Sequence, residues 1–248
     1  MQTANAQPNP IMITLSSTMD KVTFDGIWSH KTEWKNSSLD ELSYDDWTIY
    51  LRTAHQDNFI YVFIDAVSDV HLNKGADKAI ICFDTQNDKS SLPDSDDYCF
   101  MATLDGKRSF SYQGETSLGQ SNLKKIANPD GFIGISDVSN ENDRYTTVPH
   151  PSYEFRIPTS FVGRSDIYGF YLGVYDANLN KVYSWPENAL TDNLLHVPSP
   201  NTWGELVSPD KSLPEFHLPL IVFLSAVFLS LYFGRINQTR LGRQVKTK

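Results

Sequence analysis

The chain of 248 residues is poor in cysteine and lacks the short motifs that mark common enzyme families. It has two cysteines, and its six histidines all lie at least sixteen residues apart. No H-E-x-x-H, G-x-S-x-G, Walker or dinucleotide-binding pattern is present, and two thiols alone rarely form a metal site. Glycine and proline number 13 each and aromatic residues make up 12%, which excludes collagen-like and low-complexity classes. We therefore expect a packed, non-catalytic protein.

Positive charge is scarce outside the last fourteen residues. The chain has 30 acidic and 21 basic residues, but five of the basic ones and no acidic one follow Gly234. Residues 1–234 thus have a net charge of −14 (16 basic, 30 acidic), and residues 235–248 have a net charge of +5. Because an acidic body repels phosphate backbones, we expect no nucleic-acid partner.

One long apolar run precedes this basic tail. Residues 218–234 read LPLIVFLSAVFLSLYFG without a charge, and about 17–25 apolar residues span a bilayer. We predict a transmembrane helix here, with a buried core helix as the alternative. Because basic residues beside a span stay on the inner side, residues 235–248 are expected to be a cytoplasmic tail. The protein would then be a single-pass protein of the cell membrane with its main domain outside.

Two further segments bear on export and anchoring. Residues 1–10 include an A-x-A sequence at positions 4–6 without a preceding apolar region, so they are expected to be a signal-peptide remnant or a chance match. Residues 206–217 are expected to be a linker. Its end, LPEF at 213–216, together with the apolar run and Arg235, resembles archaeal PEF-type C-terminal sorting signals. That resemblance implies replacement of the helix by a lipid, whereas a plain membrane helix would be retained.

Residues 11–205 carry repeated strand signals and hardly any helical periodicity. Residues 47–54 and 59–64 are rich in β-branched and aromatic residues and flank a polar turn, which predicts a hairpin. Similar runs occur at residues 79–83, 98–103, 131–135, 153–157 and 167–175. Strands separated by loops rich in Asn, Asp, Ser, Gly and Pro are typical of an all-β, antiparallel two-sheet β-sandwich of the jelly-roll type.

An acidic loop lies between two of these strands. Residues 84–97 contain five carboxylates in fourteen positions, and calcium prefers about six to eight oxygen ligands of the kind that such loops supply. The EF-hand spacing is absent, so a solvated turn is the alternative. The candidate calcium ligands are Asp84, Asp88, Asp94, Asp96 and Asp97.

The two cysteines flank this loop. If the strands on either side pair as a hairpin, Cys82 and Cys99 lie opposite each other and can form a disulfide bond. An exported domain meets the oxidising conditions for such a bond, which would close a loop of about 18 residues and contribute about 3 kcal/mol. Two free buried thiols are the alternative.

Aromatic side chains are the candidate ligand-binding groups. The chain has five tryptophans and twelve tyrosines, and the flat face of an indole can stack on the C–H face of a sugar. Most of these rings are expected in the core. Trp185, which precedes a proline in a polar stretch, is the best candidate for an exposed sugar platform, followed by Trp34 and Trp47.

Several landmarks follow one another in a definite order between about residue 20 and residue 206. They are DGIW at 25–28 followed by Trp34, DKAIICFDT at 77–85 followed by DDY at 96–98, YEFRIP at 153–158, YD at 175–176, WP at 185–186 and WGEL at 203–206. In this order they resemble family-nine carbohydrate-binding modules and the related DOMON-like domains. The resemblance implies a jelly-roll β-sandwich, sugar binding between aromatic side chains, and structural calcium at Asp84, Asp96 and Asp97.

We therefore expect a membrane-anchored, outward-facing module that binds a glycan without catalysis. One alternative is a structural or protein-interaction domain of the cell envelope. Another follows from haem-binding members of the same superfamily, in which Met101 with His71 or His150 would ligate the iron. NSS at residues 36–38 is a glycosylation sequon, which makes Asn36 a candidate for modification. The glycan and the oligomeric state stay open.

Overall fold

The computed structural model describes residues 8–105, 108–117, 120–187, 189 and 196–208. The chain divides into two compact units, Met1–Asp210 and Lys211–Lys248, and every described residue belongs to the first. The predicted transmembrane helix at 218–234, the tail at 235–248 and most of the N-terminal remnant lie outside the described residues. None of the helices in the described part of the chain has the length and apolar character needed to cross a membrane.

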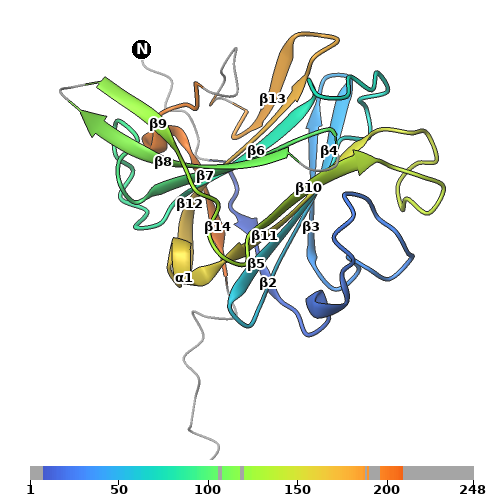
Figure 1. The fold of residues 1–248 in the computed structure, drawn as a ribbon, viewed down its shortest axis with the longest axis horizontal. Coiled ribbons are helices and arrows are strands. Elements are labelled where there is room, and N and C mark those ends of the chain that lie inside the picture. Colours follow the sequence, from blue (N-terminus) through green and yellow to red (C-terminus); the bar gives the residue numbers. More distant parts are fainter. Residues whose placement is uncertain (1–7, 106–107, 118–119, 188, 190–195, 209–248) are drawn as a thin grey trace, which may run out of the picture. The chain divides into compact units, whose positions relative to one another are not determined.

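The described residues form two β-sheets with hardly any helix (Figure 1). The strands of the larger sheet are, in order, β1 (Ile11–Met12), β14 (Gly204–Val207), β12 (Ile167–Asp176), β6 (Lys78–Asp84), β7 (Asp97–Thr103), β8 (Arg108–Ser117) and β9 (Gln120–Ile126), and β13 (Lys181–Trp185) pairs with β12. Those of the smaller sheet are β10 (Ile133–Val138), β11 (Pro151–Pro158), β5 (Phe59–Asp65), β4 (Trp47–Gln56) and β2 (Thr14–Leu15), and β3 (Ser38–Tyr44) pairs with β4. The helical pieces are η1 (Met19–Lys21), α1 (Thr159–Val162) and η2 (Pro200–Thr202). The fold is thus a two-sheet β-sandwich, as the sequence predicts.

The sheets are not purely antiparallel, in contrast to the prediction. β1 pairs with β14 and β2 pairs with β4, both in parallel. The N-terminal segment is the cause, because residues 11–15 run first along the larger sheet and then along the smaller one, with the buried Ile13 between the two short strands. This segment therefore connects the two sheets at one edge of the sandwich.

Hydrophobic clusters on both faces of the central strands explain why their sequences are apolar throughout. The main cluster takes alternate residues of β5 and β6, such as Val62 and Ile81. The residues between them point to the outer faces, where Phe63 packs with Trp28 in one cluster and Cys82 belongs to another. A strand that is covered on both sides needs apolar residues at every position, as the sequence of β5 indicates.

The β6–β7 hairpin encloses the acidic loop. In its antiparallel register Cys82 lies opposite Cys99, and a disulfide bond joins them. The last strand of the domain, β14, continues to Val207. The buried Ser208 that follows it places its hydroxyl 3.0 Å from the His55 Nε2. The first residues of the predicted linker at 206–217 therefore belong to the folded domain.

Candidate functional site

Trp185 is the last residue of β13 and keeps part of its indole ring in contact with solvent. The other side of the ring rests on β14 at Gly204, where an added Cβ would lie 2.1 Å from the indole Cη2. Phe170 on β12 packs nearby, with its ring centroid 6.1 Å from that of Trp185. A glycine at position 204 therefore leaves the space that the outer edge of the six-membered ring occupies against the strand.

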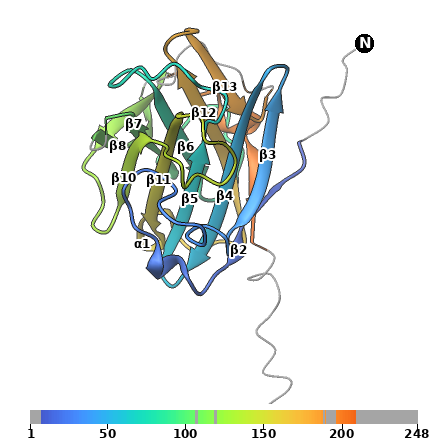
Figure 2. The same cartoon turned by 90° about the vertical axis from the view of Figure 1, so that its right-hand side faces the viewer.

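A pocket of about 340 Å³ lies beside this ring, and we call it the Trp185 pocket. It is lined by Asn9, Pro10, Ile11, Asp40, Glu41, Leu42, Ser43, Tyr44, Ser184, Trp185 and Glu187. The pocket is lined by residues of β3, which lies at an edge of the smaller sheet (Figure 2), and by residues at the end of β13, which pairs with β12 in the larger sheet. The Tyr44 hydroxyl donates a hydrogen bond of 2.9 Å to the carbonyl oxygen of Ser184, which ties the two strands together.

The Trp185 pocket combines two aromatic rings with acidic side chains. Asp40 and Tyr44 lie four residues apart on β3 and share one face of that strand. Burial raises the pKa of the Asp40 carboxyl to about 6. Burial, followed by the negative charge of Glu187, raises the pKa of the Tyr44 hydroxyl. The arrangement offers an aromatic surface together with hydrogen-bond acceptors, which suits a ligand with an apolar face and polar edges.

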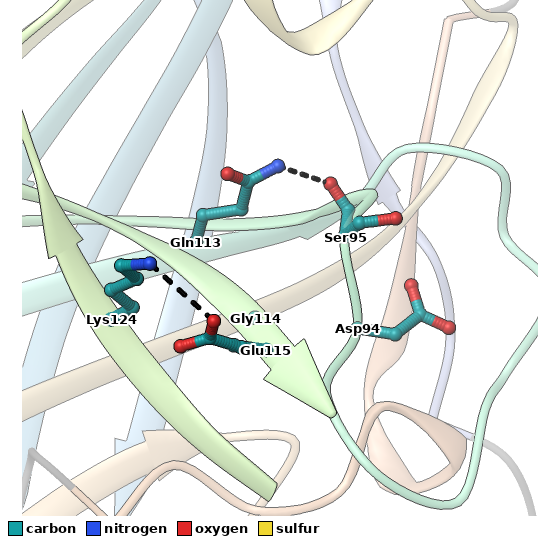
Figure 3. A pocket seen from close by; sticks show the side chains of 6 residues that line it. All are labelled: Asp94, Ser95, Gln113, Gly114, Glu115 and Lys124. Atoms are coloured by element: carbon teal, nitrogen blue, oxygen red, sulfur yellow. Dashed lines mark hydrogen bonds and ion pairs between the residues drawn. The ribbon is translucent and has the colours of Figure 1, made fainter. Parts of the chain in front are cut away.

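A second pocket, of about 360 Å³, lies where the acidic loop meets β8 and β9 (Figure 3). Its lining residues are Asp94, Ser95, Gln113, Gly114, Glu115 and Lys124. The Gln113 amide donates to the Ser95 carbonyl over 2.5 Å, and the Lys124 ammonium lies 3.4 Å from the exposed Glu115 carboxylate. Because no aromatic side chain lines this pocket, it offers no stacking surface, and the Trp185 pocket is the better candidate.

Trp34 and Trp47, the other predicted sugar platforms, are buried. Trp34 is 0% exposed, and its Nε1–H donates to the Glu154 carboxylate over 3.0 Å. Trp47 is 3% exposed and stacks on Tyr183 with ring centroids 3.8 Å apart and planes within 3°. Neither ring presents an open face to a sugar, because each completes a packed layer of the domain.

The structure brings the five carboxylates of the acidic loop into two groups that share Asp96. One group contains Asp84 and Asp97, the other Asp88 and Asp94, and within each group the oxygens that could hold an ion lie within 4.8 Å of one another. Burial raises the pKa of Asp96 to about 7 and that of Asp97 to about 8. The negative charges of neighbouring carboxylates of the same loop add to both increases in pKa.

The same carboxylates also hold the loop in shape. The Asp84 side chain accepts backbone N–H bonds from Asp88 and Lys89, and the Asp97 side chain accepts one from Asp94. These bonds alone account for an ordered turn, which is the alternative that the sequence left open. The oxygens nevertheless form the all-oxygen donor set that calcium prefers, and a carboxylate oxygen can accept an N–H bond and bind an ion at the same time.

A third acidic group was not foreseen from the sequence. Asp69, Asp77 and Asp176 are 0–1% exposed, and their oxygens lie within 4.8 Å of one another. The Asp69 Oδ2 and the hydroxyl of the buried Tyr153 have no hydrogen-bond partner among the described residues. Burial, followed by the charges of Asp77 and Asp176, raises the pKa of Asp69 to about 7. Buried, unpaired oxygens of this kind fit a hard cation.

The candidate haem ligands are held in other interactions or lie apart from the core. The His150 Nε2 lies 2.7 Å from the Asp65 carboxylate, and its Nδ1 lies 2.7 Å from the Val148 carbonyl oxygen. Met101 packs in the apolar cluster that contains the disulfide, and His71 is exposed on a loop. Ligation of an iron by either ring nitrogen of His150 would require that nitrogen to give up a contact that it makes in this structure.

The glycosylation candidate Asn36 is exposed and follows the buried Trp34 in a turn. Its side-chain amide donates to the Thr18 hydroxyl over 3.1 Å. The side chain is thus on the surface of the domain, where an attached sugar would meet solvent.

Comparison with known proteins gives structural neighbours but no sequence family. No protein-family model matches the chain, and no curated protein matches it. A carbohydrate binding module of family 9 (CBM9) from Caldicellulosiruptor kristjanssonii in complex with cellotriose is 15% identical, with a TM-score of 0.51, and the match covers 81% of this chain and 93% of that one. A CBM9 from the same organism in complex with glucose is 13% identical, with a TM-score of 0.48 and coverages of 81% and 95%. At this level of identity the likeness concerns the fold, and this chain has a CBM9-like fold.

Proposed function

We propose that this chain is a non-catalytic carbohydrate-binding module that holds a sugar in the Trp185 pocket. The observation that carries the proposal is the combination, in one pocket, of a partly exposed indole, a tyrosine and three carboxylates. A sugar ring has an apolar C–H face and hydroxyl edges, so it matches both parts of this lining. The CBM9-like fold supports the same reading, because the neighbour with a TM-score of 0.51 holds cellotriose.

The size of the pocket limits the ligand. Small-molecule sites range from about 300 to 1,000 Å³, and the Trp185 pocket, at about 340 Å³, lies at the lower end. A pocket of this volume suits one or two sugar units of a ligand better than it suits the extended flat face of a polysaccharide. In this arrangement Trp185 would lie against the ring face, while Asp40 and Glu187 would accept hydrogen bonds from hydroxyl groups.

The module would be anchored at the outer face of the cell membrane. The support comes from the sequence, in which the uncharged run at residues 218–234 precedes five basic residues and follows a body with a net charge of −14. The absence of a catalytic motif in the sequence supports a binding role without chemistry.

Calcium is the cofactor that the donor chemistry favours. The acidic loop, with Asp84, Asp96 and Asp97, and the buried group that includes Asp69 supply oxygen ligands only, and hard cations prefer such ligands. A bound ion would supply positive charge that offsets the repulsion between neighbouring carboxylates. Its role would therefore be structural, and the residues of the Trp185 pocket would contact the sugar directly.

A glycan panel tests the proposed function. We expect the purified full chain to bind one class of glycan in calcium buffer, and we expect the Trp185→Ala variant to lose that binding. Lys124→Ala is the matched control, because it changes the second pocket and leaves the first intact. A correctly folded chain that binds no glycan on a broad panel would contradict the proposal and favour a structural role in the cell envelope.

A further inference from the structure

The side chains that line the Trp185 pocket in the described part of the chain include acidic ones and no lysine or arginine. The lining of the pocket includes the carboxylates of Asp40, Glu41 and Glu187, and none of the lining residues that the structure describes is a lysine or an arginine. The described lining therefore gives the pocket a negative potential.

Two basic residues of adjacent strands are bound elsewhere. The Arg52 guanidinium on β4 donates to the Trp34 and Ser37 carbonyl oxygens. The Lys181 ammonium at the start of β13 lies 4.3 Å from the centroid of the Tyr183 ring. Neither side chain lines the Trp185 pocket, so neither places its positive charge against the acidic groups there.

Asp40 is the most buried of the three acidic residues that line the pocket, because Glu41 and Glu187 are exposed. Its side chain is half-buried, and it has no hydrogen bond or ion pair with any other described residue. Burial raises the pKa of this carboxyl to about 6, which shows that its charge is poorly solvated. A ligand that brings a positive charge would therefore gain more at this position than a neutral one.

We propose that the Trp185 pocket selects a sugar with a free, protonated amino group, of the glucosamine type, over neutral and anionic sugars. This inference rests on the proposed function and names the sugar class. An ammonium group offers three donors to Asp40 and Glu187 in charge-assisted hydrogen bonds, which are about twice as strong as neutral ones. The same cation is attracted to the faces of Trp185 and Tyr44.

The same lining disfavours other sugars. A uronic acid would place its carboxylate against three acidic side chains without a cation to offset them. An N-acetylated amino sugar would keep the shape of the ring but lose its charge. A neutral oligosaccharide would keep the aromatic stacking and ordinary hydrogen bonds. The expected order of affinity is therefore amino sugar, neutral sugar, then acidic sugar.

Calorimetric titration of the full chain tests this order. The probes are a glucosamine tetramer, its N-acetylated form, cellotetraose and tetragalacturonate at about pH 6.5, where an amino sugar is protonated and Asp40 is largely ionised. We expect the glucosamine tetramer to bind about tenfold more tightly than either neutral tetramer, as one additional charge-assisted contact predicts. No binding is expected for tetragalacturonate.

Charge variants separate pocket binding from general attraction to the acidic body. Glu187→Gln, at an exposed position, should reduce the affinity for the glucosamine tetramer about tenfold and that for cellotetraose by less, because the glutamine amide oxygen can still accept a hydrogen bond from a hydroxyl group but carries no charge. Glu141→Gln makes the same change at an exposed position on another loop and should alter neither affinity. Asp40→Asn should act like Glu187→Gln.

The possible negative results distinguish a failure of the selectivity from a failure of the proposed function. Equal binding of the amino and neutral tetramers would overturn the selectivity and leave the proposed function standing. If no tetramer binds, the selectivity is overturned, and the proposed function falls as well only if the broad glycan panel is also negative. Binding of the glucosamine tetramer that persists in Trp185→Ala, or that Glu141→Gln weakens as much as Glu187→Gln does, would show general attraction to a negative surface and overturn the inference.

Discussion

Glu154 links two landmarks of the sequence pattern that lie 120 or more residues apart. Its buried carboxylate accepts backbone N–H bonds from Asp25 and Gly26, over 2.9 and 2.7 Å, and the indole N–H of Trp34 over 3.0 Å. Gly26 has a φ of +92°, and an added Cβ there would lie 2.4 Å from the carbonyl carbon of Ser136. The D-G…W…E order therefore reflects one buried hydrogen-bond network, and Trp34 is structural for the same reason.

We expect Glu154→Gln to lower the free energy of unfolding by about 1–3 kcal/mol. A glutamine can keep its oxygen toward Asp25 and Gly26, but its amide group would then face the Trp34 N–H, donor against donor, and leave a buried polar group unpaired. Urea denaturation measures the loss. Because Trp34→Phe removes the opposing donor, Glu154→Gln should cost less in the Trp34→Phe background, and equal costs in the two backgrounds would contradict this network.

The β6–β7 hairpin shows what one element contributes to stability. Its disulfide bond closes the acidic loop, and loop closure of about 18 residues is expected to contribute about 3 kcal/mol through the unfolded state. We expect the Cys82→Ala, Cys99→Ala double variant to lose about that much in urea denaturation. The wild type measured with reductant should lose a similar amount, and an unchanged midpoint in both experiments would show that the bond does not form in solution.

The central strands could be predicted from the sequence, whereas some of the edge strands could not. Strands β5 and β6 are covered on both sides, so their apolar runs are unmistakable. Strands β3 (SLDELSY) and β9 (QSNLKKI) lie at or near sheet edges and mix polar and apolar residues without a clear period. Their strand character comes from pairing with a neighbour, which no local pattern displays.

Some residues of the candidate site could also be predicted from the sequence, and others could not. Trp185 and the carboxylates of the acidic loop could be identified, because each signal lies within a short stretch of sequence. Asp40, Glu41 and Tyr44 of the pocket come from β3, about 140 residues away from the Ser184 carbonyl that Tyr44 contacts. Asp69, Asp77 and Asp176 likewise meet only in the folded chain. Such combinations depend on topology, so spacing alone does not predict them.

At the scale of the whole molecule, buried carboxyl groups make stability depend on pH. Burial raises the pKa values of Asp65 and Asp69 to about 7 and that of Asp97 to about 8, from an ordinary value of 3.8. The folded chain therefore binds more protons than the unfolded chain between about pH 4 and pH 8. Because the unfolded state binds fewer protons there, the free energy of unfolding falls as the pH rises through this window.

We expect the melting temperature in chelator to be higher at pH 5 than at pH 8. Calcium should raise it more at pH 8 than at pH 5, because the ion replaces protons that the carboxyl groups have lost. Thermal denaturation monitored by circular dichroism measures both effects. Asp69→Asn and Asp97→Asn should each reduce the calcium effect, whereas Asp130→Asn, on the loop before β10, should not. A melting temperature that rises with pH in chelator would contradict the account.

Protection of Trp185 by a bound sugar tests the central claim most directly. Four of the five tryptophans are buried, so acrylamide quenching of tryptophan fluorescence reports chiefly on Trp185. Addition of a soluble oligosaccharide that binds the full chain should reduce this quenching in a saturable way, at the concentrations at which calorimetry shows binding. Saturable binding with no change in quenching would place the sugar away from Trp185 and contradict the proposed site.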